Sequence, residues 1–135
     1  MLLSGSKTGI FRTKPTRIDL PRNFKIIIMF TGSEGQIIPL SAAAALTSRF
    51  RTILMPLLGG IKGEFFGQDT INQVLAQPEA VGIRVYLGLS NDLIPLPKLV
   101  LVGVTAAGVD LINGVILEHG VACPPVCSIA NPLNS

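Results

Sequence analysis

The residues best suited to chemistry lie near the end of the chain, where the only histidine, His119, precedes the only two cysteines, Cys123 and Cys127. Imidazole and thiolate groups are ligands that zinc prefers, and Glu118, Asp110 or a partner chain could supply a fourth ligand. The spacing is weak evidence, because structural zinc sites usually contain two close ligand pairs and this segment has one. Three alternatives therefore stay open: a zinc site, a Cys123–Cys127 disulfide, and two reduced cysteines that pack as small apolar residues.

Two prolines, Pro124 and Pro125, lie between the cysteines and constrain the first two alternatives. Consecutive prolines favour polyproline II, so a straight path would place the cysteines roughly 12 Å apart. Bridged cysteines need Cα atoms within about 7 Å of each other. Ligation or bridging therefore requires a sharp turn, for example through a cis proline. The sequence favours the third alternative, a rigid tail with reduced cysteines that covers a sheet, and we expect no cofactor beyond the possible zinc.

Catalysis has little support in this sequence. His119 is the only available imidazole base, and there is no Gly-x-Ser-x-Gly nucleophile motif. The carboxylates are widely spaced, so no glycosidase-like pair is indicated. The glycine-rich stretch at 58–64 lacks the spacing of a phosphate-binding loop. We therefore expect a protein without enzymatic activity.

Arg84 is the one charged side chain inside the predicted strand at 81–88, and it shares a face of that strand with Tyr86. An arginine in this position could bind an anion or the carboxylate of a partner. More often such a residue makes a structural ion pair, and Glu118 and Asp110 are the candidate partners on a neighbouring strand. We expect the structural ion pair.

Two helices and three strands are expected to position these residues. Ser41 is a candidate N-cap for the first helix, and Asp69 for the second. Prolines end both helices, and alternation of apolar residues marks the first strand. The expected helices span 41–55 and 69–77, the expected strands span 81–88, 99–105 and 109–117, and a hairpin turn lies at 106–108. This order predicts an α+β domain in which two N-terminal helices pack on a small antiparallel sheet of about three to four strands.

Positive charge is concentrated at the start of the chain. Residues 1–28 hold six basic residues and one acidic residue, a net charge of +5, whereas residues 29–135 hold five basic and seven acidic residues, a net charge of −2. A basic arm can neutralise phosphates, but the arm lacks repeated aromatic–basic interleaving, so nucleic acid is the less favoured partner. We expect a disordered leader, or a mis-assigned start with Met29 as the true first residue. Residues 29–135 then form a single α+β domain with a Pro/Cys-containing C-terminal tail.

The composition predicts an apolar surface. Hydrophobic residues make up 48% of the 135 residues and charged residues 14%, where about 25% charged is usual. Large apolar patches on small proteins usually mark interfaces. Our main expectation is therefore a structural or interaction protein that forms a homo-oligomer, with no small-molecule ligand indicated. The apolar runs are too short to span a membrane and no export signal is visible, so we expect a cytoplasmic protein.

Several segments together resemble a group of short, uncharacterised bacterial proteins. The resemblance rests on Phe66-Gly67, on Gly82-Ile83-Arg84, on the strand sequence at 99–104 and on Cys-Pro-Pro-x-Cys at 123–127. It covers about residues 36–133 and leaves the basic leader outside, which favours Met29 as the start. The resemblance implies a shared organisation and no particular activity.

Overall fold

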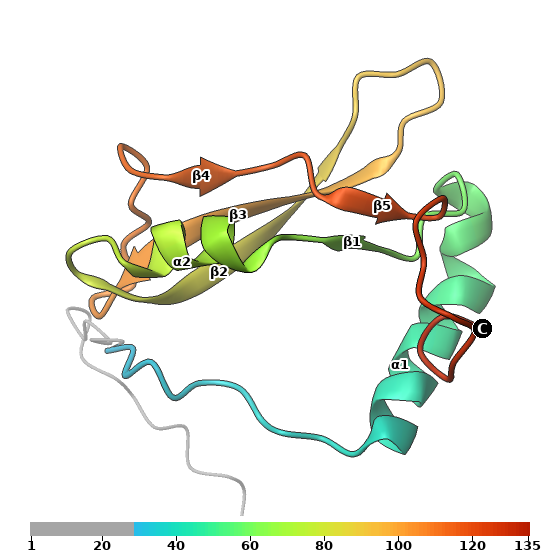
Figure 1. The fold of residues 1–135 in the computed structure, drawn as a ribbon, viewed down its shortest axis with the longest axis horizontal. Helices are drawn as coiled ribbons and strands as arrows, with labels where there is room; N and C mark the ends of the chain where they lie inside the picture. Colours follow the sequence, from blue (N-terminus) through green and yellow to red (C-terminus); the bar gives the residue numbers. More distant parts are fainter. Residues whose placement is uncertain (1–28) are drawn as a thin grey trace, which may run out of the picture.

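The computed structural model describes residues 29–135. The basic segment 1–28 lies outside the described residues, as do the leader and nucleic-acid expectations that fall on it. The elements follow the order α1 (Leu40–Ile53), a short 3₁₀ helix η1 (Met55–Leu57), β1 (Gly63–Phe65), α2 (Gln68–Leu75), β2 (Ala80–Leu89), β3 (Pro97–Thr105), β4 (Ile116–Leu117) and β5 (Val121–Cys123). Two helices and two small antiparallel sheets make an α+β fold (Figure 1), which confirms the predicted class.

The larger sheet has the strand order β2-β3-β4, and a long β2–β3 hairpin is its main part. Within this hairpin Ile83 pairs with Gly103 and Leu87 with Leu99. The two strands lie where the apolar alternation predicts them. The smaller sheet pairs β1 with β5, which brings Gly63 opposite Cys123.

The third predicted strand, at 109–117, is wrong over most of its length. Asp110 makes only an isolated bridge with Val104, and the ladder resumes at Ile116. Between these points the backbone bonds to itself in turns, from Gly114 N to Leu111 O for example. The side chain of Gln77 accepts the next amide, that of Val115, at 2.7 Å. A glycine turn and a side-chain acceptor thus replace strand pairing here.

The helices begin one residue before the predicted caps. Pro39 precedes α1, and its carbonyl accepts the amides of Ala42 and Ala43, so the Ser41 side chain makes no cap bond. Gly67 precedes α2, again without a side-chain cap bond. Prolines follow both helices closely, as the sequence indicates. The cap predictions for Ser41 and Asp69 are therefore wrong, because backbone carbonyls receive the first amides.

The core lies between α2 and the larger sheet. Val74 of α2 is fully buried, and Leu101 of β3 is buried on the sheet face that α2 covers. Val102 and Val104 of β3 are also buried, on the opposite face of the sheet. A Cβ at Gly103 would lie 2.9 Å from the Gln77 side chain and 3.4 Å from that of Val74, so the glycine allows the helix to approach the strand closely.

Helix α1 differs from the expected arrangement. It lies at the other end of the molecule, next to the last residues of the chain (Figure 1), and none of its residues is buried. Only α2 therefore packs on the three-stranded sheet in this structure. Within residues 29–135, neither helix has the length and apolar character that a membrane crossing requires.

Candidate functional site

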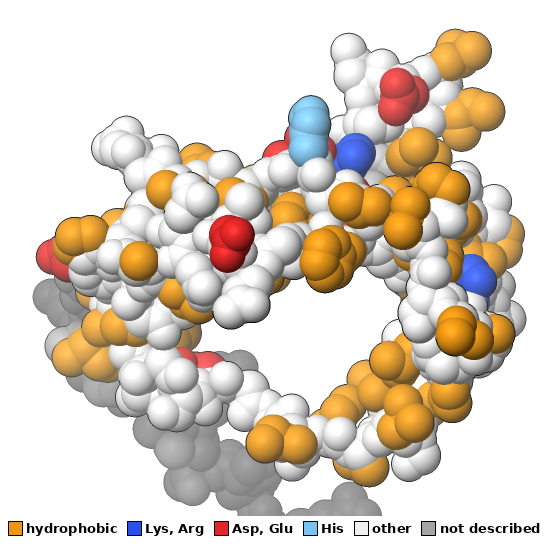
Figure 2. All heavy atoms as spheres, in the orientation of Figure 1, with side chains coloured by type: hydrophobic (Ala, Val, Ile, Leu, Met, Phe, Trp, Pro, Cys, Tyr) orange, Lys and Arg blue, Asp and Glu red, His pale blue; other side chains and the backbone are white. Residues whose placement is uncertain are grey.

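An apolar groove lies between α1 and the end of the β2–β3 hairpin, and we refer to it as the α1 groove. Its volume is about 770 Å³, within the range of ligand and peptide sites. Its apolar walls include Leu46 and Phe50 of α1, Leu54 directly after that helix, Leu87 and Leu89 of β2, and Leu99 of β3. Figure 2 shows hydrophobic side chains gathered along α1, on the side that borders a hollow in the molecule. The sequence predicts the helical stripe but not that it would line an open groove.

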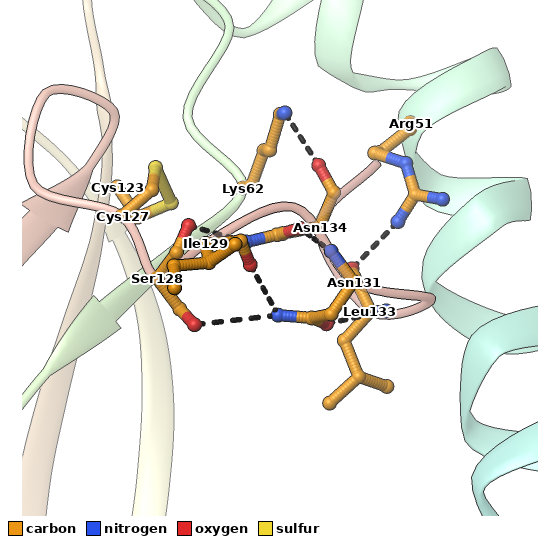
Figure 3. The surroundings of a disulfide bond; sticks show 9 residues. All are labelled: Arg51, Lys62, Cys123, Cys127, Ser128, Ile129, Asn131, Leu133 and Asn134. Atoms are coloured by element: carbon orange, nitrogen blue, oxygen red, sulfur yellow. Dashed lines mark hydrogen bonds between the residues drawn. A yellow bond between two sulfur atoms is a disulfide. The ribbon is translucent and has the colours of Figure 1, made fainter.

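Two cations, Arg51 and Lys62, line the same groove. The Arg51 guanidinium donates to the carbonyl of Leu133 at 2.6 Å, and Lys62 Nζ donates to the carbonyl of Asn134 at 2.6 Å (Figure 3). Arg51 also donates to the backbone oxygen of Ser135, the last residue of the sequence. Neither cation pairs with an Asp or Glu side chain among residues 29–135. Both cations therefore hold the tail through its backbone oxygens, and Lys62 does so through the Asn134 carbonyl alone.

Two asparagines fix the shape of the tail, residues 128–135. Asn134 donates from its side chain to the Ser128 carbonyl at 3.1 Å and accepts the Asn131 amide at 2.8 Å. Asn131 in turn accepts the Leu133 amide at 2.9 Å (Figure 3). The tail is thus a compact turn that presents Leu133 to the groove.

A disulfide joins Cys123 to Cys127 at the start of this tail, with the two Cα atoms 4.8 Å apart. The straight polyproline path expected from Pro124 and Pro125 is wrong: both peptide bonds leading into these prolines are cis, and the Val126 amide bonds back to the Ala122 carbonyl at 3.1 Å. The chain turns, so the cysteines meet instead of remaining apart and reduced. The bridge adjoins the smaller sheet, because the Lys62 amide donates to the Cys123 carbonyl at 2.7 Å.

His119 is not brought together with the cysteines. Its side chain is 86% exposed and contacts the neighbouring Glu118. Both sulfur atoms are in the disulfide, so neither is a free thiolate. In the part of the chain that the structure describes, no group of three His, Cys, Asp or Glu residues is placed to hold a metal ion.

Arg84 forms an ion pair with Asp110, one of its two candidate partners. The Tyr86 hydroxyl donates to the other oxygen of the same carboxylate. The Phe30 ring lies beside the guanidinium, 5.8 Å from ring centroid to Cζ, a distance at which cation–π attraction acts. Asp110 therefore contacts both polar side chains of β2, and its carboxylate balances the positive charge of Arg84.

The other candidate partner, Glu118, faces Lys98 instead, at 3.6 Å. Lys98 also bonds Glu64, whose carboxylate accepts the Leu99 amide at 2.9 Å and is only 2% exposed. The hydrogen bond with Glu64 raises the pKa of Lys98. Sequence reasoning missed Glu64, since a carboxylate in a short apolar–glycine stretch gives no periodic signal.

Comparisons with known proteins add no relative to this geometry: no family model matches the chain, and neither the curated proteins nor the solved structures yield a match.

Proposed function

We propose that the protein is a non-enzymatic interaction protein that self-associates, with the α1 groove as part of the interface. One observation carries the proposal: α1 has an apolar stripe, yet no residue of the helix is buried. Leu46 on this stripe is 64% exposed. A helix gains most of its stability in a protein from packing its apolar face. In the single chain the apolar face of α1 has no such packing, and a second chain would supply it.

The balance of free energies supports this proposal. Among residues 29–135, 23 large hydrophobic side chains are exposed and five hydrophobic residues are buried. Burial of one such side chain contributes about 1.5–3 kcal/mol. Association costs an estimated 4–15 kcal/mol in lost rigid-body freedom. Burying about ten of the exposed side chains, at about 1.5 kcal/mol or more each, would therefore offset even the upper figure for that cost.

Light scattering after size-exclusion chromatography tests the proposal with a matched pair of variants. Leu46→Asp places a charge on the apolar stripe, whereas Ser48→Asp places the same charge two residues away at an exposed polar position. We expect the wild type and Ser48→Asp to elute as oligomers, and Leu46→Asp to shift toward the monomer. If all three proteins had equal masses in solution, the apolar stripe of α1 would not be part of the interface.

A second candidate, a redox-linked module, is favoured by the Cys123–Cys127 disulfide. Reduction would release the tail whose carbonyls bond Arg51 and Lys62, and would free thiolates for a metal such as zinc. Disulfides persist in oxidising compartments and are rare in the cytoplasm, so a cytoplasmic location requires the bond to be transient. Mass measurement with and without alkylation detects the bond, and zinc analysis of the reduced protein tests the metal alternative.

A further inference from the structure

The loop between β2 and β3, residues 90–96, projects from the fold as an apolar tip, and we refer to it as the prong (Figure 1). Leu93 is fully exposed and Ile94 is 70% exposed. The prong is held at its base, because the Ser90 amide donates to the Leu96 carbonyl at 2.8 Å and the Leu96 amide to the Ser90 hydroxyl at 2.9 Å. Two large aliphatic side chains are thus presented on a closed loop rather than collapsed onto the body.

The prong also carries one negative charge, that of Asp92, next to its apolar tip. Asp92 is exposed and has no ion-pair partner within residues 29–135. Figure 2 shows an acidic side chain among hydrophobic ones at this projecting end of the molecule.

The α1 groove has the complementary properties. Its walls are apolar, and the two cations that line it, Arg51 and Lys62, pair with no Asp or Glu side chain in the described chain. Lys62 contacts only the Asn134 carbonyl, whereas Arg51 contacts backbone oxygens of Leu133 and Ser135. The third charged residue of the lining, Glu64, is already paired with Lys98. An apolar segment with one carboxylate therefore fits this groove better than a neutral or a basic segment.

The prong and the groove are adjacent on the surface. Leu89 and Pro97, which pair at the two ends of the prong, both line the groove. The prong of the same chain does not fill it, because Leu93 is fully exposed. When two complementary surfaces lie side by side, a two-fold axis lets each chain give and receive the same contact in one interface.

We propose that the prong of one copy inserts into the α1 groove of a second copy, with Leu93 and Ile94 against the apolar walls and Asp92 beside Arg51 and Lys62. This inference rests on the proposed function and names the occupant of the groove. It assigns the assembly as a reciprocal two-fold dimer, in which each copy supplies one prong and one groove.

Charge reversal within the full chain tests the pairing by sedimentation equilibrium. Asp92→Lys and Arg51→Glu should each weaken the dimer, by about tenfold or more in Kd as for other close interfacial charge pairs. The double variant Asp92→Lys/Arg51→Glu restores opposite charges across the interface and should recover most of that loss. If the Kd of the double variant is raised as much as the two single effects combined, the pairing is overturned.

Matched controls separate the contact from a general effect of charge. Glu79→Lys reverses an exposed carboxylate outside the prong, and Arg49→Glu reverses an exposed arginine of α1 that does not line the groove. Both should leave Kd unchanged within about twofold. Because the prong is an exposed loop, L93D/I94D should fold with an unchanged circular dichroism spectrum and yet lower the dimer fraction.

The outcomes distinguish this inference from the proposed function. If the wild type is a dimer and L93D/I94D is an equally tight dimer, the prong is not the occupant, while self-association stands. If the wild type is a monomer at high protein concentration, both are overturned. A ladder of species that grows without limit with concentration would contradict the reciprocal dimer, since it requires head-to-tail contacts that do not close.

Discussion

The carboxylate of Glu64 on β1 accepts the backbone amide of Leu99 on β3 at 2.9 Å, which links the two small sheets through one side chain. Leu99 lies beyond the short β3–β4 ladder, where β3 pairs only at Leu101 and Val102. Its amide therefore has no strand partner on that side and receives a side-chain acceptor instead. Lys98 Nζ lies 3.3 Å from the same carboxylate.

Removing this link should destabilise the fold. Glu64→Ala leaves the partly buried Leu99 amide without its acceptor, at a cost of about 1 kcal/mol, the lower end of the range for a group that loses its partner. Glu64→Gln keeps an oxygen for the amide and loses only the charge, so the loss should be smaller. Urea denaturation of the two variants measures the difference. Equal stability of Glu64→Ala and the wild type would show that the link contributes nothing.

The raised pKa of Lys98 predicts a dependence of stability on alkaline pH. The hydrogen bond with Glu64 favours the charged amine in the folded state, so the folded pKa exceeds the unfolded value of about 10.4. The resulting stabilisation is fully present below the unfolded pKa and is lost as the pH rises through the folded pKa. Thermal melts from pH 8 to 12 should therefore show a steeper decline for the wild type than for Lys98→Met. Parallel curves would count against this assignment.

Loss of the disulfide should lower stability by a modest amount. The Cys123–Cys127 bond closes a loop with a sequence separation of four, for which the chain-entropy relation gives about 2 kcal/mol. C123S/C127S and the reduced wild type should therefore melt at similar temperatures, below that of the oxidised wild type. Reductant should leave the melting temperature of the double variant unchanged. A wild type insensitive to reductant would contradict a stabilising bridge.

The Arg84–Asp110 pair should contribute through both donors to the same carboxylate. Arg84→Ala and Tyr86→Phe each remove one donor to Asp110. Both should lower the melting temperature, and Tyr86→Phe should lower the free energy of unfolding by about 1 kcal/mol. The two effects should not add, because the second donor partly compensates for the first. Arg84→Ala with an unchanged melting temperature would argue against a structural ion pair and in favour of an anion site.

Local patterns predicted much of the fold. Alternation of Val81, Ile83 and Val85 placed β2, and prolines after both helices placed their ends, because these signals depend on neighbouring residues alone. The strand expected at 109–117 failed, since its apolar content gave no sign that Gly114 and the side chain of Gln77 would satisfy the backbone in turns. Helix caps failed for a similar reason, as backbone carbonyls were the acceptors.

The site was less predictable than the fold. Asp110 as a partner of Arg84 followed from strand neighbours, but the proximity of Cys123 and Cys127 depends on a turn that the residue types alone do not specify. The α1 groove joins residues far apart in sequence, such as Phe50 and Leu99. Contacts of this kind are set by tertiary packing, which periodicity does not encode.

The central claim, self-association through the α1 groove, is tested most directly by sedimentation equilibrium of the full chain over a wide range of concentration. The account predicts a mass that rises from that of one 14.3 kDa chain to that of two and then stays constant. It also predicts that Leu46→Asp moves this transition to higher concentration and Ser48→Asp does not. A single species with the mass of one chain at every concentration would contradict the account.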